Sequence, residues 1–406
     1  MAQPVTKASG PHAERHEAVP LRDVPTGTWP AYGSGFPDLD VLLGKGLVPG
    51  AAIVVGGEPG IGKSTLLLQI AGAVADSGKK VLYASGEESL PQIKSRAERV
   101  EALNVNLLAL ATNSLGDVMA AIDADPPALL VLDSVQTMIS DQTYGLPGSV
   151  SQVRAVSNEI TSHCKNAGTT VIMVGHVTKD GDLAGPRMLE HLVDTVISLE
   201  GDRRQMFRVL RVLKNRFGPN QELLLFRMAG KGMEIVEDAS TFFLGTRDTT
   251  LSGTAVVMAI EGQRPFAVEI QALTTKTFLS VPRRTGLGFD VNRLYVLLAV
   301  LEKRLRINFA HTDIFAKVGG GMKLAEPGVD LAIIAAVLSS FYDIPLPERA
   351  VFWGEVDLNG QIRQVADHVM RMKQAQKLGY EPVFCSGDHK GAVKTVSDLQ
   401  KFLFRK

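Results

Sequence analysis

A glycine-rich segment between an apolar run and a helical pattern constrains the fold of this chain more than any other feature. Residues 57–65 read GEPGIGKST and match the pattern G-x-x-x-x-G-K-[ST]. The apolar run 51–55 precedes them, and apolar residues recur at the spacing of one helix face through residue 74. This order predicts a phosphate-binding loop, because glycines let backbone N–H groups surround a phosphate and the helix N-terminus adds positive potential.

We expect the whole loop to contact a nucleotide through Gly57, Glu58, Pro59, Gly60, Ile61, Gly62, Lys63, Ser64 and Thr65. Lys63 is long enough to reach the β and γ phosphates, and the Ser64 hydroxyl can hold Mg²⁺. The expected ligands are therefore ATP and Mg²⁺. The alternative is a glycine-rich turn that contains Lys-Ser by chance, and the position between a strand and a helix argues against it.

Strand-like and helical segments alternate through the first half of the chain. The strand-like runs lie at 80–84, 106–110, 128–132 and 170–174. The helical patterns between them lie at 90–103, 115–124 and 150–166. Three further β-like segments with short polar connections follow at 193–200, 206–213 and 222–227. The pattern predicts an α/β domain at 29–240 with a mostly parallel central sheet and an antiparallel extension, after a flexible leader at 1–28.

The second half of the chain has a different pattern, in which two β-like stretches precede four helical segments. Its β-like stretches lie at 254–260 and 266–272. Its helical patterns lie at 291–301, 329–341, 365–378 and 392–402. We expect a second, smaller α/β domain over residues 241–406.

Composition indicates a cytoplasmic protein. Cys164 and Cys385 are the only cysteines, too few for a disulfide framework or a cysteine-based zinc site within one chain. The 43 basic and 43 acidic residues cancel, so any contact with nucleic acid must come from local patches. No apolar run approaches the roughly 20 residues that cross a bilayer, and the first residues lack a secretory signal. We therefore expect no membrane and no zinc.

Polar residues at three strand ends are candidates for hydrolytic chemistry. Asp133 follows the run 129–132, where a carboxylate can hold hydrated magnesium or serve as an ordinary helix cap. Glu87 and Glu88 lie just past the second strand, and Glu87 is our first choice to activate water, although both could be surface or first-turn charges. His176 follows the run 170–174, where it could report nucleotide state or be a hydrogen-bonded histidine without a switching role.

Five segments occur in the order found in one known family. They are GEPGIGKST at 57–65, SGEES at 85–89, LVLDSVQ at 130–136, GHVTKDG at 175–181 and KNRFG at 214–218. From about Tyr32 to its end the chain resembles the bacterial RadA (Sms) family. KNRFG is the most specific of the five, because P-loop motifs are shared by many unrelated ATPases.

The resemblance implies a RecA-like ATPase core that forms a ring, with six subunits the expected number, related to DnaB-type helicases. It implies action on single-stranded and branched DNA, branch migration in recombination and repair, and a RecA-type recombinase as partner. Lys214 and Arg216, two apart on a β segment, would share one face and approach the neighbour's γ-phosphate, unless they are exposed cations on an edge strand. The alternative for the whole chain is an ATP-controlled DNA-binding clamp or recombinase mediator without translocation.

DNA contacts are expected, by analogy with the RecA core, in the loops 140–150 and 179–187. The candidates there are Tyr144 for stacking on bases, and Lys179 and Arg187 for phosphates. Seven cations of the second domain are further candidates, namely Arg283, Arg284, Lys303, Arg304, Arg306, Lys317 and Lys323. Such contacts neutralise phosphates without reading bases, so we expect salt-sensitive and sequence-tolerant binding.

The second domain resembles the Lon protease domain, as it does throughout the family. The resemblance places Gly328 where a Lon peptidase has its serine nucleophile and Val369 where it has its lysine. Neither residue can attack a carbonyl, so we expect no peptidase activity. Family members normally begin with a four-cysteine zinc module, and nothing before Cys164 could form one. Either this member lost the module or the chain has been shortened.

Overall fold

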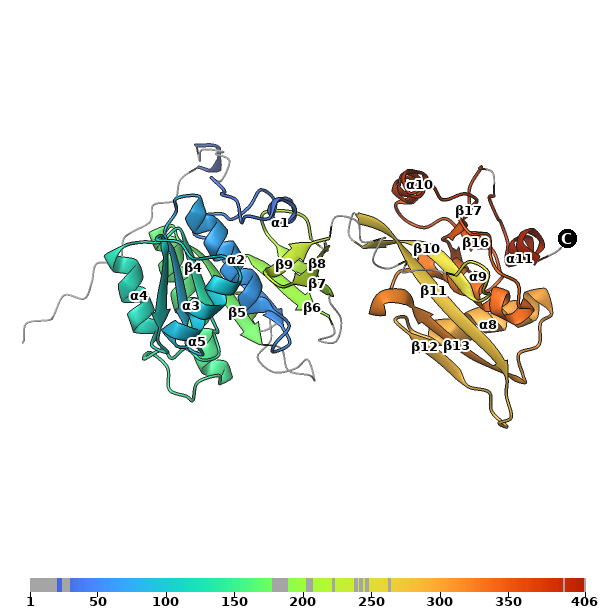
Figure 1. The fold of residues 1–406 in the computed structure, drawn as a ribbon, viewed down its shortest axis with the longest axis horizontal. Coiled ribbons are helices and arrows are strands. Elements are labelled where there is room, and N and C mark those ends of the chain that lie inside the picture. The colour runs from blue at the N-terminus through green and yellow to red at the C-terminus, as the bar shows by residue number, and fades with distance from the viewer. Residues whose placement is uncertain are drawn as a thin grey trace, which may run out of the picture.

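The structure is a computed structural model with two lobes, each built around its own sheet (Figure 1). It describes residues 20–23, 30–176, 189–201, 207–220, 223–236, 240, 244, 248–261, 264–389 and 391–404. The first lobe has a nine-stranded, mostly parallel sheet, and the second has a six-stranded mixed sheet. The predicted fold class is confirmed: an α/β domain with a mostly parallel central sheet is followed by a smaller α/β domain.

The first sheet has the strand order β3-β2-β4-β5-β1-β6-β7-β8-β9. Its parallel strands are β1 (Ala52–Gly57), β2 (Val81–Ser85), β3 (Leu107–Ala111), β4 (Leu129–Asp133), β5 (Thr170–His176) and β6 (Thr195–Glu200). The antiparallel extension consists of β7 (Phe207–Asn215), β8 (Leu223–Ala229) and β9 (Gly232–Ile235). β6 pairs in parallel with β1, so the antiparallel part begins only at β7.

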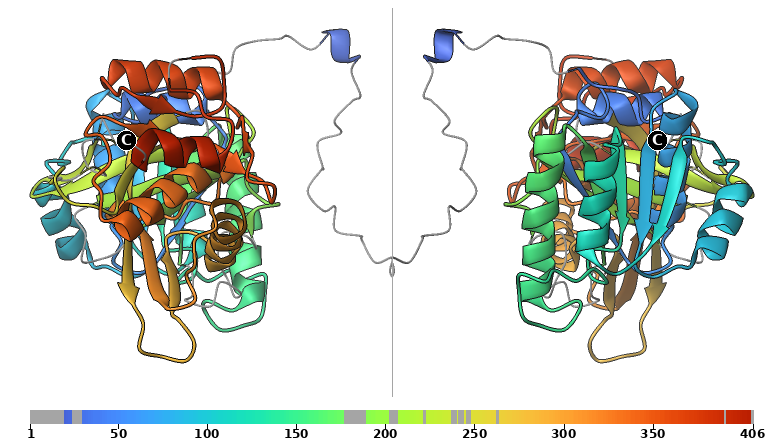
Figure 2. Two further views of the ribbon diagram at one scale, coloured as in Figure 1. Left: turned by 90° about the vertical axis from the view of Figure 1, so that its right-hand side faces the viewer. Right: turned by 90° about the vertical axis from the view of Figure 1, so that its left-hand side faces the viewer.

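Helices cover both faces of this sheet. They are α1 (Pro37–Leu43), α2 (Lys63–Asp76), α3 (Leu90–Arg99), α4 (Leu115–Ala124) and α5 (Val150–Ala167). On β1, Ile53 and Val55 pack with α1, α2 and α3, whereas Ala52 and Val54 pack with α4 and α5. Figure 2 shows α4 and α5 side by side on their face of the sheet. Burial on both faces explains why the parallel strands read as continuous apolar runs.

The second sheet has the order β12-β13-β11-β10-β14-β17. Its strands are β10 (Thr254–Glu261), β11 (Arg264–Lys276), β12 (Arg284–Leu287), β13 (Thr312–Val318), β14 (Val351–Phe352) and β17 (Val383–Phe384). A separate hairpin joins β15 (Glu355–Val356) and β16 (Ile362–Arg363). The helices are α8 (Val291–Leu305), α9 (Asp330–Tyr342), α10 (His368–Lys377) and α11 (Val396–Phe404). Ten consecutive residues at the start of α9 are buried, so this helix forms the centre of the lobe.

Several predicted boundaries were wrong, and each has a local cause. The helix predicted at 90–103 ends at Arg99, because Glu101 takes a left-handed φ of 57° that an α-helix cannot contain. The helix predicted at 365–378 begins only at His368, after Asp367 with φ 56°. The strands from β12 to β17 were not predicted. Five of these six strands have only two to four residues, which is too short for a periodic pattern.

Strand β7 has different neighbours on its two faces. Leu210 and Val212 lie in the apolar cluster that includes the P-loop helix α2. Phe207 and Val209 pack against the core cluster of the second lobe, which also includes Leu225 of β8. The extension of the first sheet is therefore shared between the two lobes.

Among the helices that the structure describes, none combines the length and the apolar character that crossing a membrane requires.

Candidate nucleotide-binding site

The glycine-rich loop joins the end of β1 to the start of α2, as its sequence predicts. Gly62 has φ 114°, and a Cβ built there would lie 2.2 Å from Cε of Met233 on β9. A Cβ on Gly57 would lie 2.5 Å from the carbonyl oxygen of Leu199 on β6. Both positions favour glycine, Gly62 because of its left-handed φ and Gly57 because its backbone lies directly against the backbone of β6.

The polar side chains of the loop are held at the first turn of α2. Lys63 is 3% exposed, and its Nζ donates hydrogen bonds to the carbonyl oxygens of Gly57 (2.8 Å) and Glu58 (3.0 Å). Ser64 and Thr65 follow it and are half-buried, whereas Glu58, Pro59 and Gly60 are exposed. The ammonium group thus lies over the loop, close to the backbone that would surround a phosphate.

Asp133 is the last residue of β4 and lies beside Ser85 at the end of β2. Its carboxylate is buried, and Oδ2 accepts a hydrogen bond of 2.6 Å from the hydroxyl of Tyr83. Burial and the charge of Asp133 raise the pKa of Tyr83 well above its usual value, so the phenol stays protonated and remains a donor. A buried carboxylate with fixed orientation at the carboxyl end of a parallel sheet suits a magnesium ion, which prefers oxygen ligands.

Glu87 and Glu88 lie next to each other but have different partners. Oε1 of Glu87 accepts a hydrogen bond of 2.6 Å from the hydroxyl of Ser134, the buried residue after Asp133. Glu88 forms an ion pair with Arg96 of α3 instead. Burial raises the pKa of Glu88, an effect that Arg96 opposes. Glu87 is thus hydrogen-bonded to the residue that follows β4, and Glu88 is ion-paired with helix α3.

His176 is the last residue of β5, and its backbone lies opposite Gly57 in the parallel register of β1 and β5. The strand therefore ends beside the start of the glycine-rich loop. Lys179 and Arg187, with the rest of the predicted DNA-binding loop at 179–187, lie outside the described residues.

Lys214 and Arg216 lie at the opposite end of β1 from the glycine-rich loop. Nζ of Lys214 donates to the carbonyl oxygens of Glu190 (2.5 Å) and Val193 (2.8 Å). Arg216 lies one residue beyond the end of β7 and pairs with Asp194 at 3.1 Å, so the prediction that it lies on the strand was wrong. Asp194 also accepts a hydrogen bond from the backbone N–H of Ala52, where β1 begins.

The residues predicted to contact DNA differ in exposure and in the hydrogen bonds that they already make. Tyr144 is fully exposed in the loop before α5. Arg283, Lys303, Arg306, Lys317 and Lys323 are also exposed. Arg284 donates instead to the carbonyl oxygens of Phe309 and Thr312, and burial lowers its pKa. Arg304 is exposed but donates to Asn359 at 3.1 Å. Arg284 is therefore a poor candidate for DNA, because its guanidinium already holds backbone carbonyls together.

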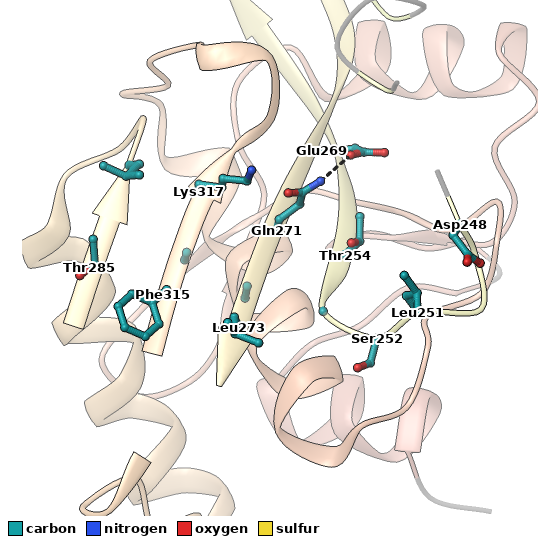
Figure 3. A pocket seen from close by; sticks show the side chains of 14 residues that line it. Asp248, Leu251, Ser252, Thr254, Glu269, Gln271, Leu273, Thr285, Phe315 and Lys317 are labelled. Carbon is teal, nitrogen blue, oxygen red and sulfur yellow. Dashed lines mark hydrogen bonds between the residues drawn. The ribbon is translucent and has the colours of Figure 1, made fainter. Parts of the chain in front are cut away.

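Lys317 lines a groove of about 590 Å³ on the open face of the second sheet (Figure 3). Leu251, Leu273 and Phe315 supply its apolar surface. Glu269 lies in the same groove and accepts a hydrogen bond of 3.0 Å from Gln271. Apolar surface and a carboxylate beside a single lysine do not resemble a phosphate-binding surface.

The region around Gly328 contains an ion pair rather than a nucleophile. Arg371 of α10 is 1% exposed, pairs with Glu326 and donates to the carbonyl oxygen of Met258 at 2.6 Å. A Cβ built on Gly328 would lie 2.9 Å from Oε2 of Glu326 and 3.1 Å from Nη1 of Arg371. Val369 is exposed on α10. A serine at position 328 would therefore displace the ion pair that stands there.

Sequence reasoning missed the residues that orient the candidate groups. Tyr83 and Ser134 lie within or beside recognised segments, but their hydrogen bonds span 50 and 47 residues of chain. Ser134 could have been noticed because it follows Asp133 directly. No sequence pattern near Arg371 indicates its role, because that role depends on Glu326, which lies 45 residues away in the chain.

Comparison with known proteins agrees with this geometry. A model of the AAA domain matches residues 19–182. The DNA repair protein RadA of Rickettsia prowazekii is 45% identical over 351 residues, which are 86% of this chain and 79% of that protein. RadA of Listeria monocytogenes is 42% identical over 387 residues (95% and 85%), and RadA of Aquifex aeolicus is 46% identical over 348 residues (86% and 78%). With an AAA-type ATPase domain and this identity over most of its length, the chain belongs to the RadA family.

Proposed function

We propose that this protein is a DNA repair motor that hydrolyses ATP, forms a ring, binds single-stranded DNA and drives branch migration of recombination intermediates. The observation that carries the proposal is the placement of two groups at opposite ends of β1. The glycine-rich loop and Asp133 lie at the carboxyl end, and Lys214 and Arg216 lie at the amino end. Relatives at 42–46% identity are named DNA repair proteins, which supports a role in repair.

Each group at the carboxyl end has a distinct task in hydrolysis. Lys63 neutralises the β and γ phosphates, while backbone N–H groups of the loop hold them. Ser64 and Asp133 would hold Mg²⁺, which screens phosphate charge when bound. Glu87 orients the attacking water and accepts its proton, and Ser134 fixes the position of the Glu87 carboxylate at 2.6 Å. Glu88 is the weaker candidate, because Arg96 already neutralises it.

Lys214 and Arg216 serve the site of a neighbouring subunit. Within one chain the length of β1 separates them from the loop, so they suit a γ-phosphate bound by the next protomer of a ring. Both must first leave their present partners, the Glu190 and Val193 carbonyls and Asp194. Mixing K214A subunits with K63A subunits should restore some hydrolysis at mixed interfaces. No recovery in verified mixed rings would place the two residues in a role within one subunit.

The second lobe, with the domain boundary at 240 and 241, is a Lon-like platform for assembly and DNA binding and not a peptidase. The ion pair of Glu326 and Arg371 beside Gly328 supports this, because it fills the place of a nucleophile. Exposed Tyr144, Arg283 and Arg306 are the candidates for DNA contact. Binding through them should weaken with salt and tolerate any sequence.

The decisive experiment measures branch migration on a synthetic three-strand junction together with ATP hydrolysis. With ATP the protein should move the branch point, and single-stranded DNA should raise the hydrolysis rate several-fold. A non-hydrolysable ATP analogue should support DNA binding but no migration. Equal product with ATP and with the analogue would identify the alternative, an ATP-controlled clamp or mediator for a RecA-type recombinase. A hydrolysis rate indifferent to DNA would contradict the motor.

A further inference from the structure

A buried arginine of β7 contacts the backbone of the glycine-rich loop. Arg208 is 5% exposed, and its Nε donates a hydrogen bond of 2.9 Å to the carbonyl oxygen of Ile61. Nη1 donates to the carbonyl oxygen of Phe207 at 2.7 Å. A guanidinium is costly to bury and is kept where its hydrogen bonds are needed. Here it reaches a loop 147 residues earlier in the chain.

The contact fixes one particular peptide of the loop. The peptide between Ile61 and Gly62 is trans, so its C=O and N–H groups point in opposite directions. Because Arg208 holds the C=O, the N–H of Gly62 must point in the opposite direction within the peptide plane. Gly62 directly precedes Lys63, and the backbone N–H groups of this motif are the donors that surround bound phosphates.

We propose that Arg208 is a positioning residue for nucleotide binding, which holds the Ile61–Gly62 peptide in the orientation that presents the Gly62 N–H to phosphate. Arg208 contacts the C=O group of this peptide and not its N–H group, so its effect on the nucleotide passes through the backbone. The inference rests on the proposed nucleotide site and adds a residue that lies outside the loop motif.

The surroundings of Arg208 keep its side chain in place. A Cβ built on Gly201 would lie 3.1 Å from Cδ of Arg208, so the aliphatic part of the side chain lies against the backbone there. Strand β9 is bound to the helix that follows the loop. The backbone N–H of Met233 donates to the Gln69 side chain of α2 at 2.8 Å, and that side chain donates to the Met233 carbonyl oxygen at 3.1 Å. The donor to Ile61 is therefore presented by packed strands on which the loop rests, and this arrangement favours one orientation of the peptide.

The test compares R208M, R208K and R211M in the full-length protein. R208M keeps much of the aliphatic volume and removes every donor, whereas R208K keeps the charge and one donor group. R211M is the matched control, because Arg211 lies on the same strand and its guanidinium Nε is 3.7 Å from Glu200. The measurements are the Kd of a fluorescent ADP analogue, and KM and kcat for ATP hydrolysis with Mg²⁺.

R208M should raise the Kd and the KM about tenfold, while kcat of the nucleotide-saturated enzyme changes less than about twofold. R208K should recover part of the affinity, and R211M should bind like the unmodified protein. Unchanged Kd and KM in folded R208M, or equal losses in R211M, would overturn the positioning role. If R208M does not fold, R208K decides: a two- to fivefold rise in Kd supports the role, and an unchanged Kd overturns it.

The same titration separates this inference from the proposed function. An unmodified protein that fails to bind the ADP analogue would overturn the nucleotide site and Arg208 together. An unmodified protein that binds and hydrolyses, but does not depend on Arg208, would overturn the positioning role alone.

Discussion

Carboxylates lie both at the carboxyl end of the first sheet and in the region around Gly328, but their partners differ. In the first lobe Asp133 and Glu87 accept hydrogen bonds from the neutral hydroxyls of Tyr83 and Ser134. In the second lobe Glu326 pairs with a guanidinium. A hydroxyl orients a carboxylate and leaves its negative charge in place, whereas a guanidinium cancels that charge. The first arrangement suits reactive groups, and the second suits a folded core.

This difference also applies inside the first lobe. Glu88 is adjacent to Glu87 but pairs with Arg96, in the manner of the second lobe. The hydrogen bond from Ser134 and the ion pair with Arg96 therefore distinguish two neighbouring carboxylates that the sequence alone left as alternatives.

The largest effect is expected from removing the buried cation of the loop. K63A should reduce ATP hydrolysis by roughly three orders of magnitude or more, because no other side chain of the loop can neutralise the β and γ phosphates. The rate is measured with and without single-stranded DNA. K45A, which removes an exposed lysine outside the loop, should hydrolyse ATP normally. Substantial hydrolysis by K63A would mean that ATP is not hydrolysed at the glycine-rich loop.

The next effect sharpens the comparison of hydroxyl and guanidinium partners. E87Q should lower kcat by roughly 100- to 1,000-fold with an unchanged Kd for ADP, because the proposed base is lost and the proposed phosphate contacts remain. E88Q should lower kcat less than about tenfold. Steady-state hydrolysis with saturating ATP measures kcat of both variants. A larger loss in E88Q would show that a paired carboxylate can still serve catalysis.

A smaller effect is expected in the second lobe, on stability. R371M should lower the free energy of unfolding by about 3 kcal/mol, because it leaves the Glu326 carboxylate in a protein interior without its counter-charge. The double variant R371M/E326M should recover part of this loss, which urea unfolding measures. R349M, at an exposed arginine that donates to Gly379, should change stability by less than about 0.5 kcal/mol. If the double variant were no more stable than R371M, the result would contradict the view that Arg371 stabilises the fold by neutralising Glu326.

The smallest effect concerns pH. Burial raises the pKa of Asp330 to about 6, although Val356 N–H and Arg293 favour its charged form. The unfolded chain loses this proton near its ordinary pKa of 3.8, so the contribution of Asp330 to stability is fully present below that pH and is lost as pH rises through about 6. The fall should be on the order of 2 kcal/mol and absent in D330N. Urea unfolding between pH 4 and 7 tests this, and parallel curves for the two proteins would contradict it.

Features that depend on neighbours in sequence could be predicted, and features that depend on distant contacts could not. The order of strands and helices in the first lobe follows from local apolar periodicity, and the helix at 115–124 has the predicted bounds. The family assignment follows from short contiguous motifs and is confirmed. The roles of Tyr83, Ser134 and Arg208 required the fold, since each acts on a residue at least 47 positions away. The short strands of the second sheet are defined by their pairing partners, which no local pattern reveals.

The two faces of β7 have a thermodynamic consequence. Phe207 and Val209 belong to the packing of the second lobe, and Arg208 between them is bonded to Ile61 of the glycine-rich loop. If nucleotide binding tightens the contact of this strand with the loop, it changes the free energy of any event that moves the second lobe. Linkage is reciprocal, so a ligand that holds the second lobe in one orientation must change nucleotide affinity by the same factor. Nucleotide titrations at increasing concentrations of such a ligand would then measure the coupling between the two lobes.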